Sequence, residues 1–225
     1  WRALPETVPR RDPKALDGAH LLRNARGVAS NPTFRAWALL VASTYGGLFT
    51  YLSASSFALI GVLGLSPAQY GIALASNSSV YIAGTFVCRR WLGRYGLVGA
   101  AQRGAWFTAA AAIGWAAIAF VPGLPHALLL PLVIGCQWLH ALGHGVHQPC
   151  GQAGAIGPFP QSAGLASALA GCLLALTAFA IGLWLGRHLD GTLQPMARSI
   201  ALWSALTAVI AWTLVRRHGQ PAAVR

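Results

Sequence analysis

Acidic residues are nearly absent from this sequence. Only 4 of its 225 residues are Asp or Glu, against 16 Lys and Arg, and charged residues make up 9% of the chain. Soluble domains carry about 25% charged residues, and a chain that is 56% hydrophobic cannot cover its surface with polar side chains. The composition therefore speaks against a soluble enzyme and excludes disorder, which requires low hydrophobicity. It predicts that the lipid bilayer surrounds the protein.

Cysteine is also scarce. The four cysteines form no CxxC pair and lie in or at the edges of apolar runs: Cys88, Cys136, Cys150 and Cys172. This placement favours reduced, buried thiols over a disulfide framework or a cysteine metal site.

Six long apolar runs are present, each close to the ~20 residues that a transmembrane helix needs. They cover residues 36–60, 67–87, 105–121, 127–150, 164–186 and 197–215. The alternation that marks membrane strands is absent, and the runs are rich in Ala, Leu and Gly. The sequence thus predicts an all-α membrane protein. A connector (1–35) with a short amphipathic helix precedes a six-helix bundle (36–215), and a tail (216–225) follows it.

The basic residues are unevenly divided between the two sides of the predicted bundle. If the spans alternate in direction, fourteen Lys and Arg fall on the side of the termini, and only Arg187 and Arg198 fall on the other. Cytoplasmic segments of membrane proteins are enriched in Lys and Arg. Both termini are therefore predicted to be cytoplasmic. The charge of +12 is a topology signal, and no nucleic-acid partner is expected.

The first 31 residues lack the apolar core of a signal peptide. Asp12 and Pro13 can start a helix, in which Leu22 and neighbouring apolar residues recur at helical spacing against Arg23 and Arg26. Such a helix is typical of segments that lie on the anionic inner leaflet. The chain opens on Trp1 rather than Met, and we expect it to be a fragment or an excised half.

A short motif occurs twice. P-x-x-x-G-[IL]-A-x-A opens the second run at Pro67 and the fifth run at Pro160. Both copies begin the second helix of a triplet. This position favours two inverted three-helix repeats, an arrangement common in transporters.

Several motifs along the chain, in their order and spacing, resemble one family of transporters. They are Leu4-Pro5-Glu6-Thr7, Asn31-Pro-Thr-Phe34, Tyr45-Gly-Gly-Leu-Phe49-Thr-Tyr51, Ser53-Ala-Ser-Ser-Phe57, Gly64-Leu-Ser-Pro67-Ala-Gln69-Tyr70-Gly71, residues 84–96 with Arg90 and Arg94, Pro158-Phe159-Pro160 and Ala163-Gly164-Leu-Ala166-Ser167-Ala168. Together they are similar to the second half of the bicyclomycin and chloramphenicol resistance group of drug:proton antiporters, which belongs to the major facilitator superfamily.

This resemblance implies a fold, a function and a partner. The six runs would be helices seven to twelve of a multi-pass protein of the bacterial inner membrane. The first and fourth would line the central cavity, the second and fifth would face the other half, and the third and sixth would face lipid. The partner would be a missing N-terminal six-helix half, and the function proton-driven export of small amphipathic molecules by alternating access.

The fourth run carries the strongest local feature, three histidines at helical spacing. His140, His144 and His147 can share one face of a helix, and ionisable groups inside a membrane are typical of functional sites. Three interpretations stay open: substrate contacts made by Gln137, His140, His144 and Gln148, a zinc site, or hydrogen bonds to neighbouring helices. The loose backbone and the lack of nearby acids speak against zinc.

Further candidate residues come from the first and fourth runs and from the segment that follows the second run. Aromatic rings in the first run, Tyr45, Phe49 and Tyr51, offer surfaces for flat or cationic ligands. Bending of the fourth helix is expected at Gly143, Gly145 and Pro149. The resemblance implies that Arg90 and Arg94 belong to a basic loop that helps to hold helices together on the cytoplasmic side.

All four acids, Glu6, Asp12, Asp17 and Asp190, lie outside the apolar runs. Because proton-coupled carriers usually place carboxylates within the membrane, this part of the protein is expected to shape a cavity while the other half supplies the proton site. We expect a transporter rather than an enzyme, with no cofactor and no metal. The alternatives are a membrane-embedded zinc enzyme that uses the histidines and a module that dimerises through its Gly and Ala faces.

Overall fold

The structure, a computed structural model, describes residues 18–121 and 123–220, and within them every regular element is a helix. In chain order the elements are α1 (Gly18–Ser30), α2 (Pro32–Ser56), the π-helical segment η1 (Phe57–Val62), α3 (Pro67–Phe120), α4 (His126–Ile156), the 3₁₀ turn η2 (Pro160–Ser162), α5 (Ala163–His188), α6 (Gln194–Ile210), the π-helical segment η3 (Ala211–Val215) and α7 (Arg216–His218). The all-α prediction is confirmed.

Two of the motifs quoted above are helix start signals. Asn31 caps α2, because its side-chain oxygen accepts hydrogen bonds from the backbone N–H groups of Thr33 and Phe34. Ser66 caps α3 in a capping box with Gln69, and Pro67 occupies the first turn. These side chains satisfy backbone donors that apolar surroundings would leave without partners.

Helix α3 is divided in two at Gly96. Its 54 residues would extend about 80 Å as one helix, far more than the ~30 Å of a hydrocarbon core. Gly96 leaves the helical conformation with φ 65° and ψ −176°, and only glycine adopts this region readily. The chain reverses here, so α3 supplies two passes along the bundle.

Five helices of the described part are long and apolar enough to cross a membrane, and one of them is the divided α3. These helices make the protein an integral membrane protein, and all six predicted runs lie in helices. The loop predicted between the second and third runs was wrong, because helix continues from residue 87 to the reversal at Gly96 and again from the reversal to residue 105. Arg90 and Arg94 are therefore helical rather than part of a loop. Apolar composition marks the part of a helix that lies in lipid, whereas backbone hydrogen bonding extends beyond it.

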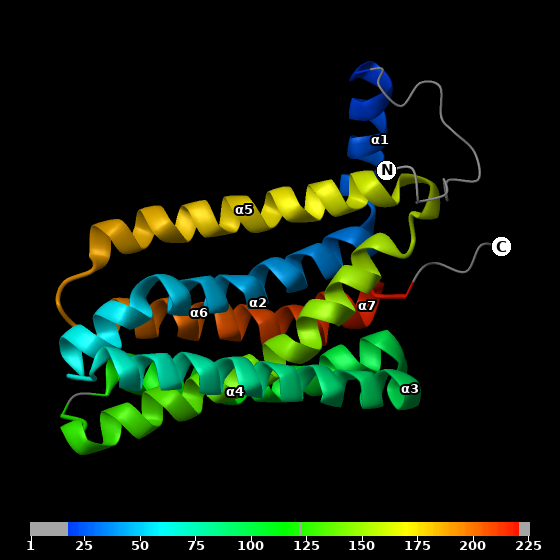
Figure 1. The fold of residues 1–225 in the computed structure, drawn as a ribbon. Helices are drawn as coiled ribbons and strands as arrows, with labels where there is room; N and C mark the ends of the chain where they lie inside the picture. Colours follow the sequence, from blue (N-terminus) through cyan, green and yellow to red (C-terminus); the bar gives the residue numbers. More distant parts are fainter. Residues whose placement is uncertain (1–17, 122, 221–225) are drawn as a thin grey trace, which may run out of the picture.

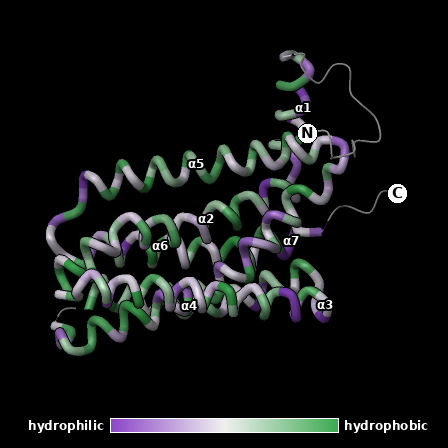
Figure 2. Tube along the Cα trace, viewed as in Figure 1, coloured by the Kyte–Doolittle hydropathy of each residue, from purple (hydrophilic) through white to green (hydrophobic). Residues whose placement is uncertain are grey.

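Successive passes run in opposite directions along the bundle (Figure 1). α1, α7 and the reversal of α3 lie at one end, and the connection between α5 and α6 lies at the other. In Figure 2 the spans are mainly hydrophobic, and hydrophilic segments gather at the ends. The described cations are thus divided between the two ends as the sequence predicts. That the basic end is cytoplasmic stays a prediction.

Helix α1 stands across the bundle axis at the basic end (Figure 1). Val28 is buried against the bundle, while Leu22 keeps 73% of its surface exposed. A helix that crosses the axis at the end of the spans is placed as a helix on the membrane surface would be. The predicted start at Asp12 and Pro13 lies outside the described residues.

Glycines allow α3 and α4 to pack backbone to backbone. A Cβ atom added to Gly84 would lie 2.6 Å from the carbonyl oxygen of Leu142, and one added to Gly145 would lie 2.5 Å from that of Tyr81. Small residues at such crossings let membrane helices approach closely, since no hydrophobic force drives them together in lipid.

Gly145→Ala should therefore destabilise the protein, because the backbone it would touch cannot yield without separating the helices. We expect a loss of about 1–3 kcal/mol in the free energy of unfolding, measured by SDS titration of the helicity of the purified protein in mixed micelles. The matched control is Gly135→Ala, also on α4, where an added Cβ meets nothing within 4 Å. Equal stability of the two variants would contradict the proposed close packing.

Candidate functional site

Buried polar side chains form a layer between two hydrophobic clusters. Toward the α5–α6 connection the first cluster includes Tyr51, Trp115 and Ile200, and toward α1 and α7 the second includes Trp37, Cys150 and Val215. Between them lie buried polar residues of α2, α3, α4 and α6, which we call the mid-bundle polar layer: Ser43, Thr44, Asn77, Gln137, His140, His144, Ser204 and Thr207. The layer lies halfway along the spans, where burial of polar groups is most costly.

His140 is the centre of this layer. Its Nε2 lies 3.3 Å from the carbonyl oxygen of Thr44 on α2, and its Nδ1 lies 2.9 Å from Oγ of Ser204 on α6. Because a carbonyl can only accept, Nε2 carries a proton, and in the neutral ring Nδ1 accepts from the serine hydroxyl. Gly47 provides the space for the ring, since a Cβ added there would collide with it. Both ring nitrogens are thus satisfied inside the bundle.

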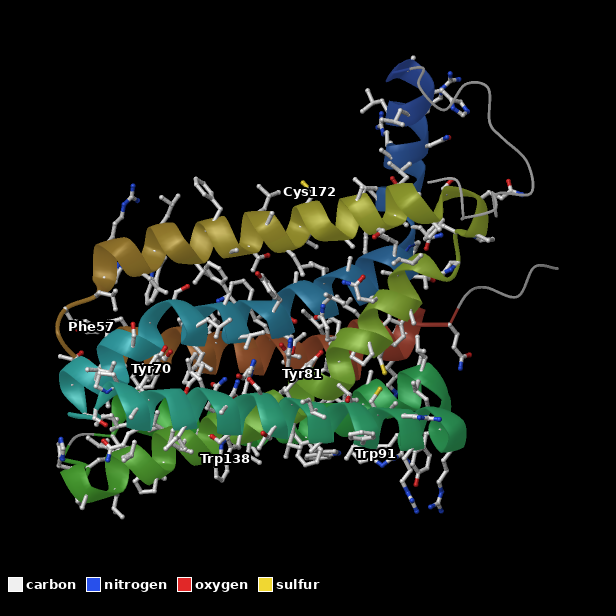
Figure 3. All side chains as sticks on the ribbon, in the orientation of Figure 1. Phe57, Tyr70, Tyr81, Trp91, Trp138 and Cys172 are labelled. Carbon is white, nitrogen blue, oxygen red and sulfur yellow. The ribbon has the colours of Figure 1, made fainter. Side chains whose placement is uncertain are left out.

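His144 connects α4 with α2 and α3. Its Nδ1 lies 3.0 Å from Oγ1 of Thr44, and its ring centroid lies 5.3 Å from that of Tyr81. Figure 3 shows Tyr81 in the middle of the bundle, on the first pass of α3. Thr44 therefore contacts both imidazoles, with its carbonyl toward His140 and its hydroxyl toward His144.

Hydroxyl pairs continue the layer between α2 and α6. Oγ1 of Thr207 donates to Oγ of Ser43 across 3.1 Å, and Thr50 and Ser199 are joined by a hydroxyl pair of 2.9 Å. In the membrane interior these short side chains hold two helices together through directional bonds.

Two amide oxygens in α4 have unused acceptor capacity. Nε2 of Gln137 donates to Oδ1 of Asn77 across 3.3 Å, but Oε1 of Gln137 is buried and has no hydrogen-bond partner among the described residues. Oε1 of Gln148 is in the same state. A buried acceptor without a partner costs about 1–3 kcal/mol, so both are places where a ligand or a different packing would be favoured.

The three histidines do not converge on one point. His140 contacts α2 and α6, His144 contacts α2 and α3, and Nε2 of His147 donates to the carbonyl of Ala101 on the second pass of α3 across 3.1 Å. Among the described residues, no three His, Cys, Asp or Glu side chains are grouped so that they could hold one metal ion. The arrangement gives the zinc interpretation no support.

The three aromatic candidates of α2 are separated. Tyr45 and Phe49 are half-buried, with ring centroids 6.0 Å apart. Tyr51 is fully buried in the first hydrophobic cluster, and its hydroxyl has no partner among the described residues. Tyr45 and Phe49 therefore offer a shared ring surface, whereas Tyr51 belongs to the core in this conformation.

The glycines of α4 are packing residues in this conformation. An added Cβ at Gly143 would lie 2.5 Å from Cγ2 of Thr108, and Gly145 faces the backbone of α3 as described above. Helix α4 continues through Pro149 without a break. A role of these three residues in bending stays a prediction.

At the reversal of α3, the closest contact of a basic side chain is made by Arg103 and not by the predicted Arg90 or Arg94. Arg90 and Arg94 are exposed, and the guanidinium carbon of Arg94 lies 5.3 Å from the ring centroid of Tyr95. That of Arg103 lies only 3.3 Å from the same centroid, and its Nη1 donates to the carbonyl of Gly99. The Tyr95–Arg103 pair thus stabilises the reversal, and sequence reasoning missed it.

The thiols are free, as predicted. Sγ of Cys88 and Sγ of Cys150 lie 3.5 Å apart in the buried contact between α3 and α4. Cys172 differs from the prediction, because it is exposed on α5. Figure 3 shows it on the side of α5 that is turned away from the bundle.

Sequence reasoning also missed Thr44 and Ser204, the partners of the histidines. Nothing in their local sequence marks them, since isolated hydroxyls are common in membrane helices. Only their spatial neighbour His140 gives them a role. Thr44 lies 96 positions before His140 in the chain, and Ser204 lies 64 positions after it.

Thr44→Val should weaken the layer by removing the hydroxyl that faces His144 while keeping the side-chain volume. We expect the free energy of unfolding to fall by about 0.6 kcal/mol, and by at most about 1.7 kcal/mol, in the same SDS titration. Thr213→Val is the control, because the exposed Thr213 hydroxyl bonds only to Val209 of its own helix. A loss no larger than that of the control would show that the bond between Thr44 and His144 contributes nothing.

No family model of known proteins matches this chain, and no curated protein matches it either. Membership in the major facilitator superfamily stays a prediction from the sequence motifs.

Proposed function

We propose that this chain is the C-terminal six-helix half of a major facilitator transporter, which exports small amphipathic molecules in exchange for protons. Its six passes form two inverted three-helix repeats, α2 with both passes of α3 and α4 with α5 and α6. The substrate cavity lies between this half and an N-terminal half in the bacterial inner membrane. Both termini of the chain are cytoplasmic.

The mid-bundle polar layer is the observation that supports this proposal most directly. Secondary transporters bind substrate and coupling ions near the bilayer midplane, between structural repeats. Here the buried histidines and hydroxyls are concentrated halfway along the spans, between two apolar clusters. Ionisable side chains inside a membrane are costly and typical of functional sites, and here two buried imidazoles, His140 and His144, belong to the layer.

The unused acceptors of Gln137 and Gln148 further support a transport cycle. Alternating access moves helices against one another, so a group without a partner in one state can gain one in the next. No carboxylate lies in the described spans, since Asp190, in the connection between α5 and α6, is the one acid that the described part contains. The proton site of the proposed antiporter therefore belongs to the other half.

Tyr45 and Phe49 are the proposed substrate contacts of α2. Their tilted rings form an aromatic surface that is half-open to the surroundings, and such surfaces attract flat and cationic ligands. The proposed substrate class follows from these rings, because an aromatic surface favours molecules that are flat or cationic and partly apolar.

The double variant Tyr45→Ala/Phe49→Ala should lower the affinity for a lipophilic cation such as ethidium by about fivefold or more. This is the effect expected when one or two contacts between the cation and an aromatic ring are lost. Equilibrium binding to the purified protein in nanodiscs measures it through ethidium anisotropy. The matched control is Trp106→Ala/Trp212→Ala, which removes another aromatic pair, with centroids 4.8 Å apart and Trp106 68% exposed. Equal losses in both double variants would remove Tyr45 and Phe49 from the site.

The proposal of a half-transporter has a direct functional test. Proteoliposomes that contain this chain alone should show no ethidium flux driven by a proton gradient. Flux should appear when the chain is co-reconstituted with the N-terminal six-helix half encoded upstream of it. Proton-driven flux by the chain alone would overturn the proposal.

A further inference from the structure

A cleft of about 300 Å³ lies between α5 and α6, outside the mid-bundle polar layer. Helix α5 supplies Ala180, Ile181 and Trp184, and α6 supplies Arg198, Ser199, Leu202 and Trp203. α5 and α6 make few contacts with each other, because α5 packs mainly on α2, whereas α6 packs on α3 and on α2. The cleft is therefore the space that α2 leaves between its two neighbours.

The α6 wall of the cleft is held in place by α2. The ring of Trp203 lies against Gly46, where an added Cβ would lie 2.5 Å from Cδ2 of the indole. Ser199 forms its hydroxyl pair with Thr50 on the same helix. On the other wall, Ile181 is only 4% exposed. These contacts make the cleft a built feature rather than a gap between mobile side chains.

The polarity of the cleft changes along its length. Arg198 stands at the end near the α5–α6 connection, one turn or about 6 Å into α6. Toward the interior the walls are aliphatic and aromatic, and Leu202 at the opening is 57% exposed. A cation at the membrane interface above an apolar cleft complements a molecule with an anionic head and a hydrocarbon chain.

Arg198 has donors to offer such a head. Within the described residues, its Nη2 donates to Oε1 of Gln194 across 2.9 Å, which uses one of the five N–H groups of a guanidinium. Asp190 is nearby, but its Oδ1 accepts from the N–H and the hydroxyl of Thr192. The Thr192 hydroxyl, together with the nearby Arg198 charge, lowers the pKa of Asp190 below its usual range. The carboxylate is thus ionised but bonded to Thr192 rather than to Arg198.

We propose that this cleft binds an anionic phospholipid of the leaflet at the α5–α6 end, with the phosphate at Arg198 and an acyl chain between α5 and α6. The phospholipid is favoured as the occupant because it brings a negative head at the level of Arg198 and a chain at the level of Trp203. The cleft opens toward the surroundings of the bundle at Leu202, where lipid is the solvent. This inference depends on residence in a membrane and not on transport.

Brominated phospholipids test the proposal, because bromine on an acyl chain quenches nearby tryptophans. The protein is reconstituted with brominated phosphatidylglycerol or brominated phosphatidylcholine, and the difference between wild type and Trp184→Phe isolates the Trp184 indole, one of the two in the cleft. We expect the anionic lipid to quench this indole at several-fold lower mole fraction than the zwitterionic lipid. Equal quenching by the two lipids would overturn the proposal.

Two variants and a matched control assign the preference to the cleft. Arg198→Gln should reduce the preference for phosphatidylglycerol about fivefold, the effect of one cation near a lipid surface. Arg187→Gln, which removes an exposed cation at the same end but outside the cleft, should leave it unchanged. Ala180→Phe fills the cleft and should lower quenching by both lipids, although Arg198 is retained.

Three further results would contradict the proposal. They are equal effects of Arg198→Gln and Arg187→Gln, quenching unaltered by Ala180→Phe, and displacement of the anionic lipid by ethidium at the concentration that saturates the aromatic site. The last result would make the cleft part of the substrate path instead of a lipid site.

Discussion

The need to satisfy polar groups inside an apolar solvent governs this structure. In lipid there is no water to replace a missing hydrogen bond, so each buried imidazole, hydroxyl and amide needs a partner on a neighbouring helix. The mid-bundle polar layer meets most of this need with bonds that run between helices, such as those of His140 to α2 and α6, and leaves Oε1 of Gln137 without a partner among the described residues. The relative positions of α2, α4 and α6 are therefore fixed by directional contacts as well as by apolar packing.

Glycine makes these contacts possible. His140 fits because Gly47 has no side chain, and α4 reaches the backbone of α3 because Gly84 and Gly145 have none. Close approach brings short hydroxyl side chains within reach of partners on other helices, which longer spacings would prevent. Gly143 and Gly145, which the sequence suggests as points of bending, are thus also positions of close contact between helices.

Helix α5 differs from the other spans. It packs mainly on α2, and few of its residues are buried. This peripheral position leaves a broad apolar surface for lipid or for a further six-helix half, and it opens the cleft beside α6. The polar layer and the cleft therefore result from opposite local conditions, dense packing around α4 and sparse packing around α5.

The sequence by itself determined the helical class, the six apolar runs, the start of the second run at Pro67, and the distribution of cations between two ends. Each depends on local composition or on neighbours within one turn, which a single segment expresses. Tertiary structure alone decided the burial of Tyr51 apart from Tyr45 and Phe49, and the different partners of the three histidines. Those outcomes depend on residues far apart in the chain, such as Thr44 and Ser204 around His140, and no local pattern encodes which helices become neighbours.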